Sequence, residues 1–166
     1  MNIIVKLYYT WTNLKPIKFA IVTSILSIVI TLPIYFLFKI AGINYSEIGG
    51  PEMKKYGIIG ILFIGLILGP IIETLLLQAL PIYFTQKFVK WKTNLISILI
   101  SALLFSLGHL EYSVWYFALI FPTGVILAMT YIIFQKRKES SFWMTFSIHS
   151  LRNSFPAIAT ILQLLK

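Results

Sequence analysis

Residues 19–38 read FAIVTSILSIVITLPIYFLF and contain no charged side chain. Lys15 and Lys18 precede this stretch, and Lys39 follows it. A helix of about 20 apolar residues is long enough to cross the hydrocarbon core of a bilayer. The stretch is also too long for the apolar core of a signal peptide. The segment therefore predicts a transmembrane helix that stays in the mature protein.

The composition of the whole chain agrees with a membrane location. Of its 166 residues, 58% are hydrophobic and 11% are charged, and the mean hydropathy is +0.88. Such a chain has too little polar surface to stay dissolved in water. The net charge of +9 does not indicate a nucleic-acid partner, because the basic residues lie between apolar segments and act as topology signals. We therefore expect an integral membrane protein surrounded by lipid bilayer.

Further apolar segments continue the pattern of the first. We predict an all-α, polytopic transmembrane helix bundle of about five spans, folded as a single domain over residues 1–166. No internal repeat or linker divides it. Besides the first span, the predicted spans are residues 56–84, 93–110, 112–135 and 140–165.

The basic residues between these segments predict the orientation. With the N-terminus inside, nine Lys and Arg residues lie on the inner side and four on the outer side. The positive-inside rule therefore favours an N-in, C-out topology. The inner residues are Lys6, Lys15, Lys18, Lys87, Lys90, Lys92, Lys136, Arg137 and Lys138, and the outer ones are Lys39, Lys54, Lys55 and Lys166.

Few polar side chains interrupt the predicted spans, and each is costly in lipid unless it has a partner or a function. At about 1.5 Å of rise per residue, Glu73, His109, His149 and Asn153 lie roughly 13 to 22 Å from the inner ends of their helices. All four therefore lie near mid-membrane. His149 and Asn153 are four residues apart and share one helix face. We expect three helices to bring these side chains to one polar pocket.

The residue types in this set are suited to amide hydrolysis. A carboxylate beside an imidazole can activate water, and a histidine with an asparagine can donate hydrogen bonds to a developing oxyanion. The chain has no cysteine and no aspartate, which excludes thiol nucleophiles and the two-aspartate intramembrane proteases. It also lacks a Gly-x-Ser-x-Gly elbow and the HExxH motif of zinc proteases.

Three other interpretations of these residues stay open. Each histidine taken alone can be a hydrogen-bonded packing residue. Glu73 can form a structural salt bridge with Arg152. Finally, Glu73, His109 and His149 form a His₂Glu set that can hold zinc with water in the fourth position.

The same residues resemble the CAAX protease and bacteriocin-processing (CPBP, or Abi) family of intramembrane glutamic endopeptidases. Its FxxxH motif matches FSLGH at residues 105–109, and its HxxxN motif matches HSLRN at residues 149–153. Its first motif, EExxxR in most members, corresponds here to ETLLLQ at residues 73–78. The motifs follow the family's order on separate predicted spans, so the motif-bearing core covers about residues 56–166.

The resemblance implies a metal-independent protease without a cofactor. It implies that Glu73 is the general base on water and that His109 shares this water. His149 and Asn153 would then form the oxyanion site, and Phe105 would shape the pocket.

Two positions depart from the family's pattern. Thr74 replaces the second glutamate and Gln78 replaces the arginine, at positions i and i+4 that would make them side-by-side partners. Because a buried ion pair can be exchanged for a neutral pair at little cost in stability, we expect a changed support for the site and not a lost catalyst. We interpret Arg152 as a support residue or as a binder of a substrate carboxylate.

These observations predict an endopeptidase that cuts a membrane-associated peptide or protein. The small size resembles the bacterial members of the family, which favours a bacterial cytoplasmic (inner) membrane. The oligomeric state stays open. The alternative from another class is a non-catalytic bacteriocin-immunity or peptide-binding membrane protein that uses the same polar cleft.

Overall fold

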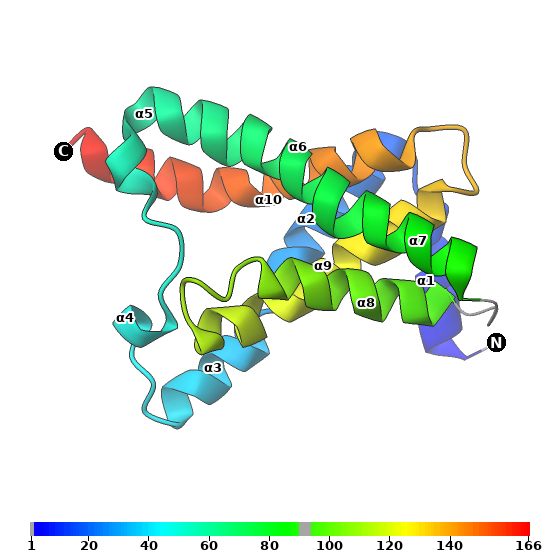
Figure 1. Ribbon diagram of the computed structural model, residues 1–166, viewed down its shortest axis with the longest axis horizontal. Coiled ribbons are helices and arrows are strands. Elements are labelled where there is room, and N and C mark those ends of the chain that lie inside the picture. Colours follow the sequence, from blue (N-terminus) through cyan, green and yellow to red (C-terminus); the bar gives the residue numbers. More distant parts are fainter. Residues whose placement is uncertain (1, 90–93) are drawn as a thin grey trace.

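The protein is described by a computed structural model over residues 2–89 and 94–166. These residues form helices and connecting turns without any β-strand, which confirms the all-α prediction (Figure 1). Lys90, Lys92 and Thr93, which the sequence assigns to an inner loop and to the start of a span, lie outside the described residues.

The helical elements follow one another with short connections. In chain order they are α1 (Ile3–Thr12), α2 (Pro16–Val29), α3 (Leu32–Ile40), α4 (Tyr45–Ile48), η1 (Met53–Tyr56), α5 (Gly57–Gly60), η2 (Ile61–Leu68), α6 (Gly69–Glu73), η3 (Thr74–Ala79), α7 (Leu80–Phe88), α8 (Asn94–Leu107), α9 (Val114–Phe134) and α10 (Ser141–Leu164).

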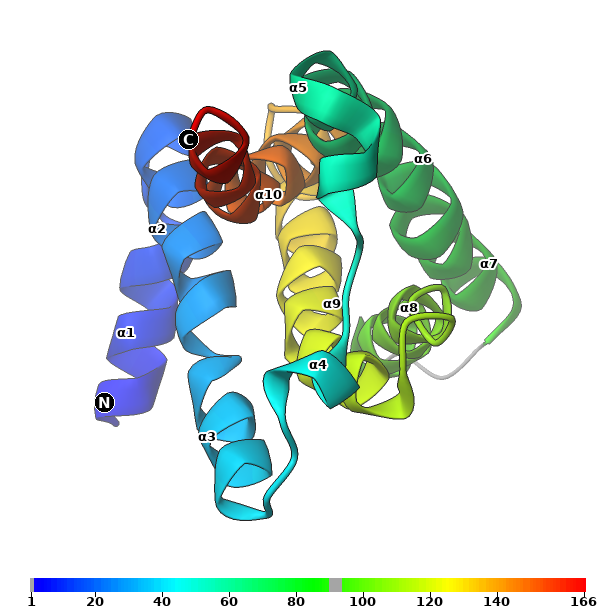
Figure 2. The same cartoon turned by 90° about the vertical axis from the view of Figure 1, so that its left-hand side faces the viewer.

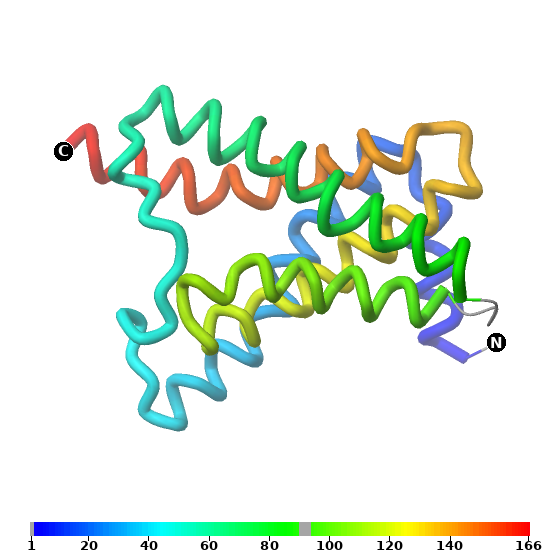
Figure 3. The backbone as a smooth tube through the Cα atoms, in the orientation of Figure 1, coloured from blue at the N-terminus to red at the C-terminus, as the bar shows by residue number. Residues whose placement is uncertain are grey.

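The chain passes back and forth between two ends of the bundle (Figure 3). The connections 41–56 and 108–113 lie at one end together with the C-terminus, which we call the C-terminal end of the bundle (Figure 1). The N-terminus and the connection 135–140 lie at the opposite end (Figure 1). This up-and-down path is the one expected of a polytopic bundle with short loops.

Three helical runs within the described residues are long and apolar enough to cross a membrane. They are Pro16–Ile40, Met53–Phe88 and Val114–Phe134. Helix α8 is apolar but has only 14 residues, and α10 is long enough, with 24 residues, but carries the polar third motif. The structure therefore supports a membrane protein with three candidate spans among the five that the sequence predicts.

Small residues let the helices at the centre of the bundle approach closely. Helix α9 lies in the middle, next to α8, α10 and α2 (Figure 2). A Cβ atom built on Gly124 of α9 would lie only 3.0 Å from the backbone of Ala102 on α8. Phe105, Leu127 and Ile148, from α8, α9 and α10, fill the core around this contact. Such small-residue contacts replace the hydrophobic driving force that lipid removes.

The run from Met53 to Phe88 contains two prolines that disturb its backbone hydrogen bonds. Pro70 and Pro81 have no N–H, so the carbonyls four residues earlier, Leu66 and Leu77, lose their α-helical donors. The helix adopts π-helical turns directly before both prolines, in η2 and η3. In the first of them the Gly69 N–H bonds five residues back, to Ile64 O. π-Turns of this kind are common at functional sites.

Neighbouring helices donate hydrogen bonds to the carbonyls that these turns release. Ser150 Oγ of α10 donates to Leu66 O at 2.6 Å, and Ser101 Oγ of α8 donates to Leu77 O at 2.8 Å. Serine side chains in this role are what makes proline tolerable inside a membrane helix. Glu73 lies between these two attachment points. Its helix is therefore fixed both to α8, which precedes His109, and to α10, which carries His149.

We predict that removing either serine loosens the bundle. Ser150→Ala leaves Leu66 O without this donor and should lower the free energy of unfolding by about 0.6 kcal/mol, the average for interhelical hydrogen bonds in membranes, and by no more than about 1.7 kcal/mol. Denaturation in lipid nanodiscs measures the loss. Ser154→Ala is the matched control, because Ser154 Oγ donates within its own helix, to Leu151 O.

A variant of Pro70 tests whether this proline is the reason that Leu66 O depends on Ser150. In a Pro70→Ala background the new N–H can bond Leu66 O, so Ser150→Ala should cost less than it does in the parent protein. Equal costs in the two backgrounds would contradict this explanation.

Candidate active site

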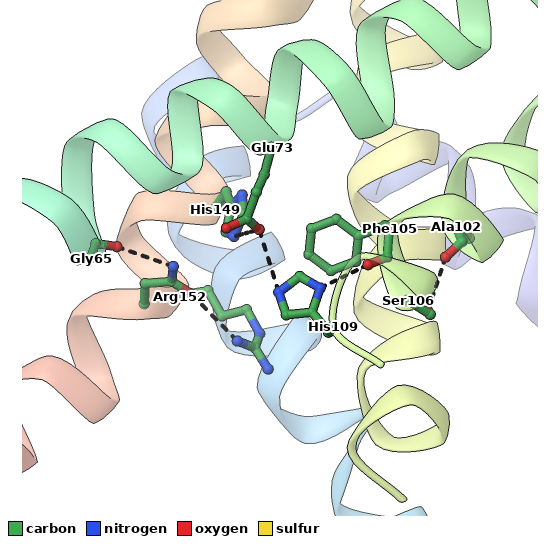
Figure 4. Close-up of polar contacts among 9 residues, drawn as sticks. Gly65, Glu73, Ala102, Phe105, Ser106, His109, His149 and Arg152 are labelled. Carbon is green, nitrogen blue, oxygen red and sulfur yellow. Dashed lines mark hydrogen bonds and ion pairs between the residues drawn. The ribbon is translucent and has the colours of Figure 1, made fainter. Parts of the chain in front are cut away.

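The carboxylate of Glu73, the last residue of α6, lies between two imidazole rings (Figure 4). Its Oε2 atom is 3.5 Å from Nε2 of His109 and 3.5 Å from Nε2 of His149. The side chain of Glu73 is 28% exposed, whereas those of His109 and His149 are 14% and 3% exposed. The structure thus brings together three of the four side chains that the sequence places at one depth, and one carboxylate oxygen faces both rings.

His109 lies in the turn that follows α8, not on the helix itself. The sequence extends the third span to Leu110, but α8 ends at Leu107 and the chain turns at Gly108. His109 Nδ1 is 2.7 Å from Phe105 O. Because a carbonyl oxygen only accepts, Nδ1 carries the proton of this bond. In the neutral ring, Nε2 is then an acceptor that faces Glu73.

Phe105 packs against the rings of both histidines. Its ring centroid is 4.8 Å from that of His109 and 5.5 Å from that of His149, the latter in an edge-to-face arrangement. Phe105 is buried in the core of the bundle and also lines the cavity at the site. Its side chain therefore has both roles that the sequence suggests, as a core aromatic and as a wall of the pocket.

Asn153 lies on α10 one turn after His149 and lines the same cavity. Its Nδ2 atom donates to Gly65 O at 3.2 Å. Gly69, which in an α-helix would donate to this carbonyl, bonds Ile64 O instead. An amide nitrogen carries two protons, so the second N–H of Asn153 stays available to a bound molecule.

Arg152 points into the space beside Glu73 and His109 (Figure 4). Its Nη1 atom donates to Asn153 Oδ1 at 3.5 Å, and no salt bridge within 4.0 Å joins it to a carboxylate in residues 2–89 or 94–166. The salt bridge with Glu73 that the sequence left open is therefore not formed.

Thr74 and Gln78 are fully buried and do not line the cavity. They do not form the hydrogen-bonded pair that their spacing suggested. Gln78 Oε1 instead lies 2.7 Å from Ser101 Oγ of α8, and Thr74 Oγ1 has no hydrogen-bond partner in the described part of the chain. The physical reason is that Ser101 is already held beside this helix by Leu77 O. Both residues therefore lie behind the site, where Gln78 contacts the neighbouring helix α8.

The site opens into a cavity of about 520 Å³ that is lined in part by residues from the C-terminal end of the bundle. This size is typical of ligand pockets, which span about 300 to 1,000 Å³. Its outer wall is the connection between α3 and α5, including Tyr45, Glu52 and Met53. The sequence treats this segment as a plain outer loop and does not predict its part in the site.

Close contacts hold this wall against Tyr112 and the first turn of α9. Gly49 and Gly50 have φ angles of +70° and +138°, which favour glycine. A Cβ atom on Gly49 would lie 3.1 Å from Tyr112 O, and one on Gly50 would lie 3.2 Å from the Tyr116 ring.

Sequence reasoning missed Ser101, Ser150 and the carbonyl of Gly65 as the groups that position the site. The signal for two of them is the pair of prolines in the second span, because each proline marks a released carbonyl four residues earlier. No group of three or more His, Cys, Asp or Glu side chains in the described ranges has the arrangement to hold a metal ion.

Comparison with known proteins gives one family. A search of curated proteins and a search of solved structures gave no match. A family model described as type II CAAX prenyl endopeptidase Rce1-like matches residues 54–155. This range contains all three motifs and more than half of the chain, which confirms the resemblance seen in the sequence. The chain belongs to the Rce1-like family of type II CAAX prenyl endopeptidases.

Proposed function

We propose that this protein is an intramembrane glutamic endopeptidase that hydrolyses a peptide bond of a membrane-associated peptide or protein. Family membership implies a protease. The observation that carries the residue assignment is the position of Glu73 Oε2, 3.5 Å from the Nε2 atoms of both His109 and His149. A general base and its partners must lie within reach of one water molecule, and these groups do.

The water is activated between Glu73 and His109. With Nδ1–H of His109 donating to Phe105 O, both Nε2 of His109 and the carboxylate are acceptors, so one water molecule can donate a proton to each. Glu73 takes a proton as the water oxygen attacks the carbonyl carbon of the substrate. This forms the tetrahedral intermediate.

The facing side of the cavity stabilises the negative charge that develops on the carbonyl oxygen. His149, with a proton on Nε2, and the second amide N–H of Asn153 donate hydrogen bonds to this oxyanion. The intermediate then collapses, the C–N bond breaks, and Glu73 returns its proton to the leaving amine. The products are a new carboxyl group and a new amine, and the carboxylate of Glu73 is restored.

We predict that Glu73→Gln and His109→Ala abolish measurable cleavage, because loss of a general base costs about 10²- to 10⁴-fold. His149→Ala and Asn153→Ala should each lower kcat about 10²- to 10³-fold, the usual cost of an oxyanion donor. A fluorogenic peptide assay with purified protein measures these values. Glu139→Gln, a change in the connection at the opposite end of the bundle, should keep full activity. Parent-like turnover in Glu73→Gln or His109→Ala would contradict the assignment.

We also propose that the reaction needs no metal. Incubation with EDTA or 1,10-phenanthroline should leave kcat unchanged. Activity that chelators remove and zinc restores would instead support the His₂Glu zinc alternative. Binding of a toxin peptide without cleavage, together with cell protection that survives Glu73→Ala, would support the non-catalytic immunity alternative.

For the topology, we propose five spans with the N-terminus inside, in the cytoplasmic membrane of a bacterium. Two observations support α10 as a span despite its polarity. It packs against α2, α9 and η2, and its histidine is buried, so its polar face is turned toward the bundle interior. In this orientation the cavity opens on the external face, and substrates enter from outside.

Labelling of single cysteines tests this topology in a chain that has none of its own. Lys54→Cys, on the wall of the cavity end, should react with a membrane-impermeant maleimide in intact cells. Lys138→Cys, in the connection at the opposite end, should react only after lysis. The reverse pattern would overturn the N-in orientation and the external opening.

A further inference from the structure

The second ring nitrogen of His149, Nδ1, has no part in the chemistry described so far. Nε2 of this ring faces the Glu73 carboxylate at 3.5 Å (Figure 4). A carboxylate oxygen accepts hydrogen bonds, so the single proton of the neutral ring belongs on Nε2. Nδ1 is then an acceptor. It is buried, and it has no hydrogen-bond partner in the described part of the chain. Buried polar atoms of this kind are normally satisfied by protein or by ordered water.

The other histidine of the site is held in the opposite way. His109 Nδ1 is 2.7 Å from the carbonyl oxygen of Phe105, four residues earlier, and therefore carries the proton. The residue four before His149 is Thr145, and Nδ1 bonds neither its carbonyl nor any other described group. Such a bond would put the proton on Nδ1 and leave Nε2 unable to donate to an oxyanion. His149 therefore needs a donor at Nδ1, where His109 needs an acceptor.

The side chain of Thr145 is the donor that α10 places next to this nitrogen. Thr145 and His149 are four residues apart, so their side chains lie on one face of the helix. Thr145 is fully buried, and its Oγ1 atom also lacks a hydrogen-bond partner among residues 2–89 and 94–166. A hydroxyl group can donate one hydrogen bond and accept others. An unpartnered donor thus lies one helical turn from an unpartnered acceptor.

Other hydroxyl groups of the bundle are satisfied by their own helix. Thr85 Oγ1 donates to Pro81 O at 2.8 Å, and Ser106 Oγ donates to Ala102 O at 2.9 Å. These bonds to a carbonyl four residues earlier are the usual solution for a buried hydroxyl in a helix. Thr145 has a carbonyl at the same spacing on α10 and does not bond it. Its hydroxyl is therefore free for a partner beside His149.

Further unpartnered polar atoms lie on the elements that pack against this face. Helices α9 and α10 are packed neighbours joined by the connection 135–140. Thr130 precedes this connection by as many residues as Thr145 follows it, so the two lie at one level of the bundle. Thr74 and Gln78 belong to η3, which packs against both helices. Thr130 Oγ1, Thr74 Oγ1 and Gln78 Nε2 are all buried without a hydrogen-bond partner within the described ranges. A buried water molecule needs about two to four polar partners, and this region supplies them.

We propose that Thr145 is a positioning residue for His149, and that it acts through a buried water molecule. The Thr145 hydroxyl donates to the water, and the water donates to Nδ1 of His149. The proton of the neutral ring is thereby kept on Nε2, where it faces the reacting carbonyl. This inference rests on the proposed function, in which Nε2 of His149 donates to the oxyanion. It adds that the two histidines of the site are held as opposite tautomers.

The tautomers can be measured directly because the chain contains two histidines. In protein labelled with ¹⁵N-histidine, the chemical shift of each ring nitrogen distinguishes a protonated nitrogen from a bare one. The parent protein in lipid nanodiscs at neutral pH should have the proton of His109 on Nδ1 and that of His149 on Nε2. His109→Gln leaves one histidine and assigns the signals. A His149 ring with its proton on Nδ1, or with protons on both nitrogens, would overturn the proposal.

Variants of Thr145 then test its hydroxyl. Thr145→Val keeps the shape of the side chain, and it should move part of the His149 population to the tautomer protonated on Nδ1. It should also lower kcat about 2- to 10-fold with little change in KM, the effect expected of one neutral hydrogen bond. Thr145→Ser keeps the hydroxyl and should restore the parent tautomer and kcat. Thr85→Val is the matched control, because the Thr85 hydroxyl bonds within its own helix, and it should change neither quantity.

A purely structural role of Thr145 gives a different result. Thr145→Val would then lower the unfolding temperature and leave the tautomer of His149 as it is in the parent protein, which would overturn the proposal. A tautomer that responds to Thr74→Val and not to Thr145→Val would also overturn it. A crystal structure that resolves ordered water should show one molecule within hydrogen-bond distance of both Nδ1 and Thr145 Oγ1.

The tautomer measurement does not depend on turnover, so this proposal and the proposed activity can fail separately. If the parent protein cleaves no peptide but Thr145→Val shifts the His149 tautomer, the support of His149 by Thr145 stands and the proposed activity fails. If Glu73→Gln abolishes cleavage as predicted but Thr145→Val changes neither the tautomer nor kcat, the proposed activity stands and this inference fails.

Discussion

Two backbone carbonyls that prolines deprive of their helical donors determine how the helices of this bundle meet. In lipid no water can satisfy a released carbonyl, so another part of the protein must do so. Pro70 and Pro81 release Leu66 O and Leu77 O, and serines of α10 and α8 donate to them. The hydrogen bonds that compensate for the prolines thus attach the second span to its two neighbours, on either side of Glu73.

This attachment explains how a site can form with so few polar residues. The side chains of the site are oriented by backbone carbonyls. His109 bonds to Phe105 O, Asn153 to Gly65 O and Ser150 to Leu66 O. The helix backbones therefore orient these side chains without further charged groups. The exchange at Thr74 and Gln78 fits this arrangement, because Gln78 bonds to Ser101 behind the site and neither side chain reaches the cavity. Gln78 thus contacts a neighbouring helix, whereas Thr74 Oγ1 has no hydrogen-bond partner among the described residues.

The sequence predicts the helical fold and the meeting of the acid and the histidines, since uncharged stretches and rare mid-span polar residues are strong signals in a membrane chain. It does not predict the local details that tertiary contacts decide. A straight-helix rise places His109 on a span, whereas the chain turns at Gly108 before reaching it. The spacing of Thr74 and Gln78 predicts that their side chains pair, but Gln78 contacts Ser101 of the neighbouring helix instead. The cavity wall at residues 45–56 depends on contacts with α9 that no local pattern encodes.

We propose that Glu73 activates a water molecule and does not itself attack the substrate. A single turnover in H₂¹⁸O, with enzyme in excess over peptide, tests it directly by mass spectrometry. Attack by water predicts one ¹⁸O atom in the new carboxyl group of the product and no label in Glu73. An unlabelled product together with ¹⁸O in the Glu73 carboxylate would indicate a covalent acyl intermediate and would contradict the account.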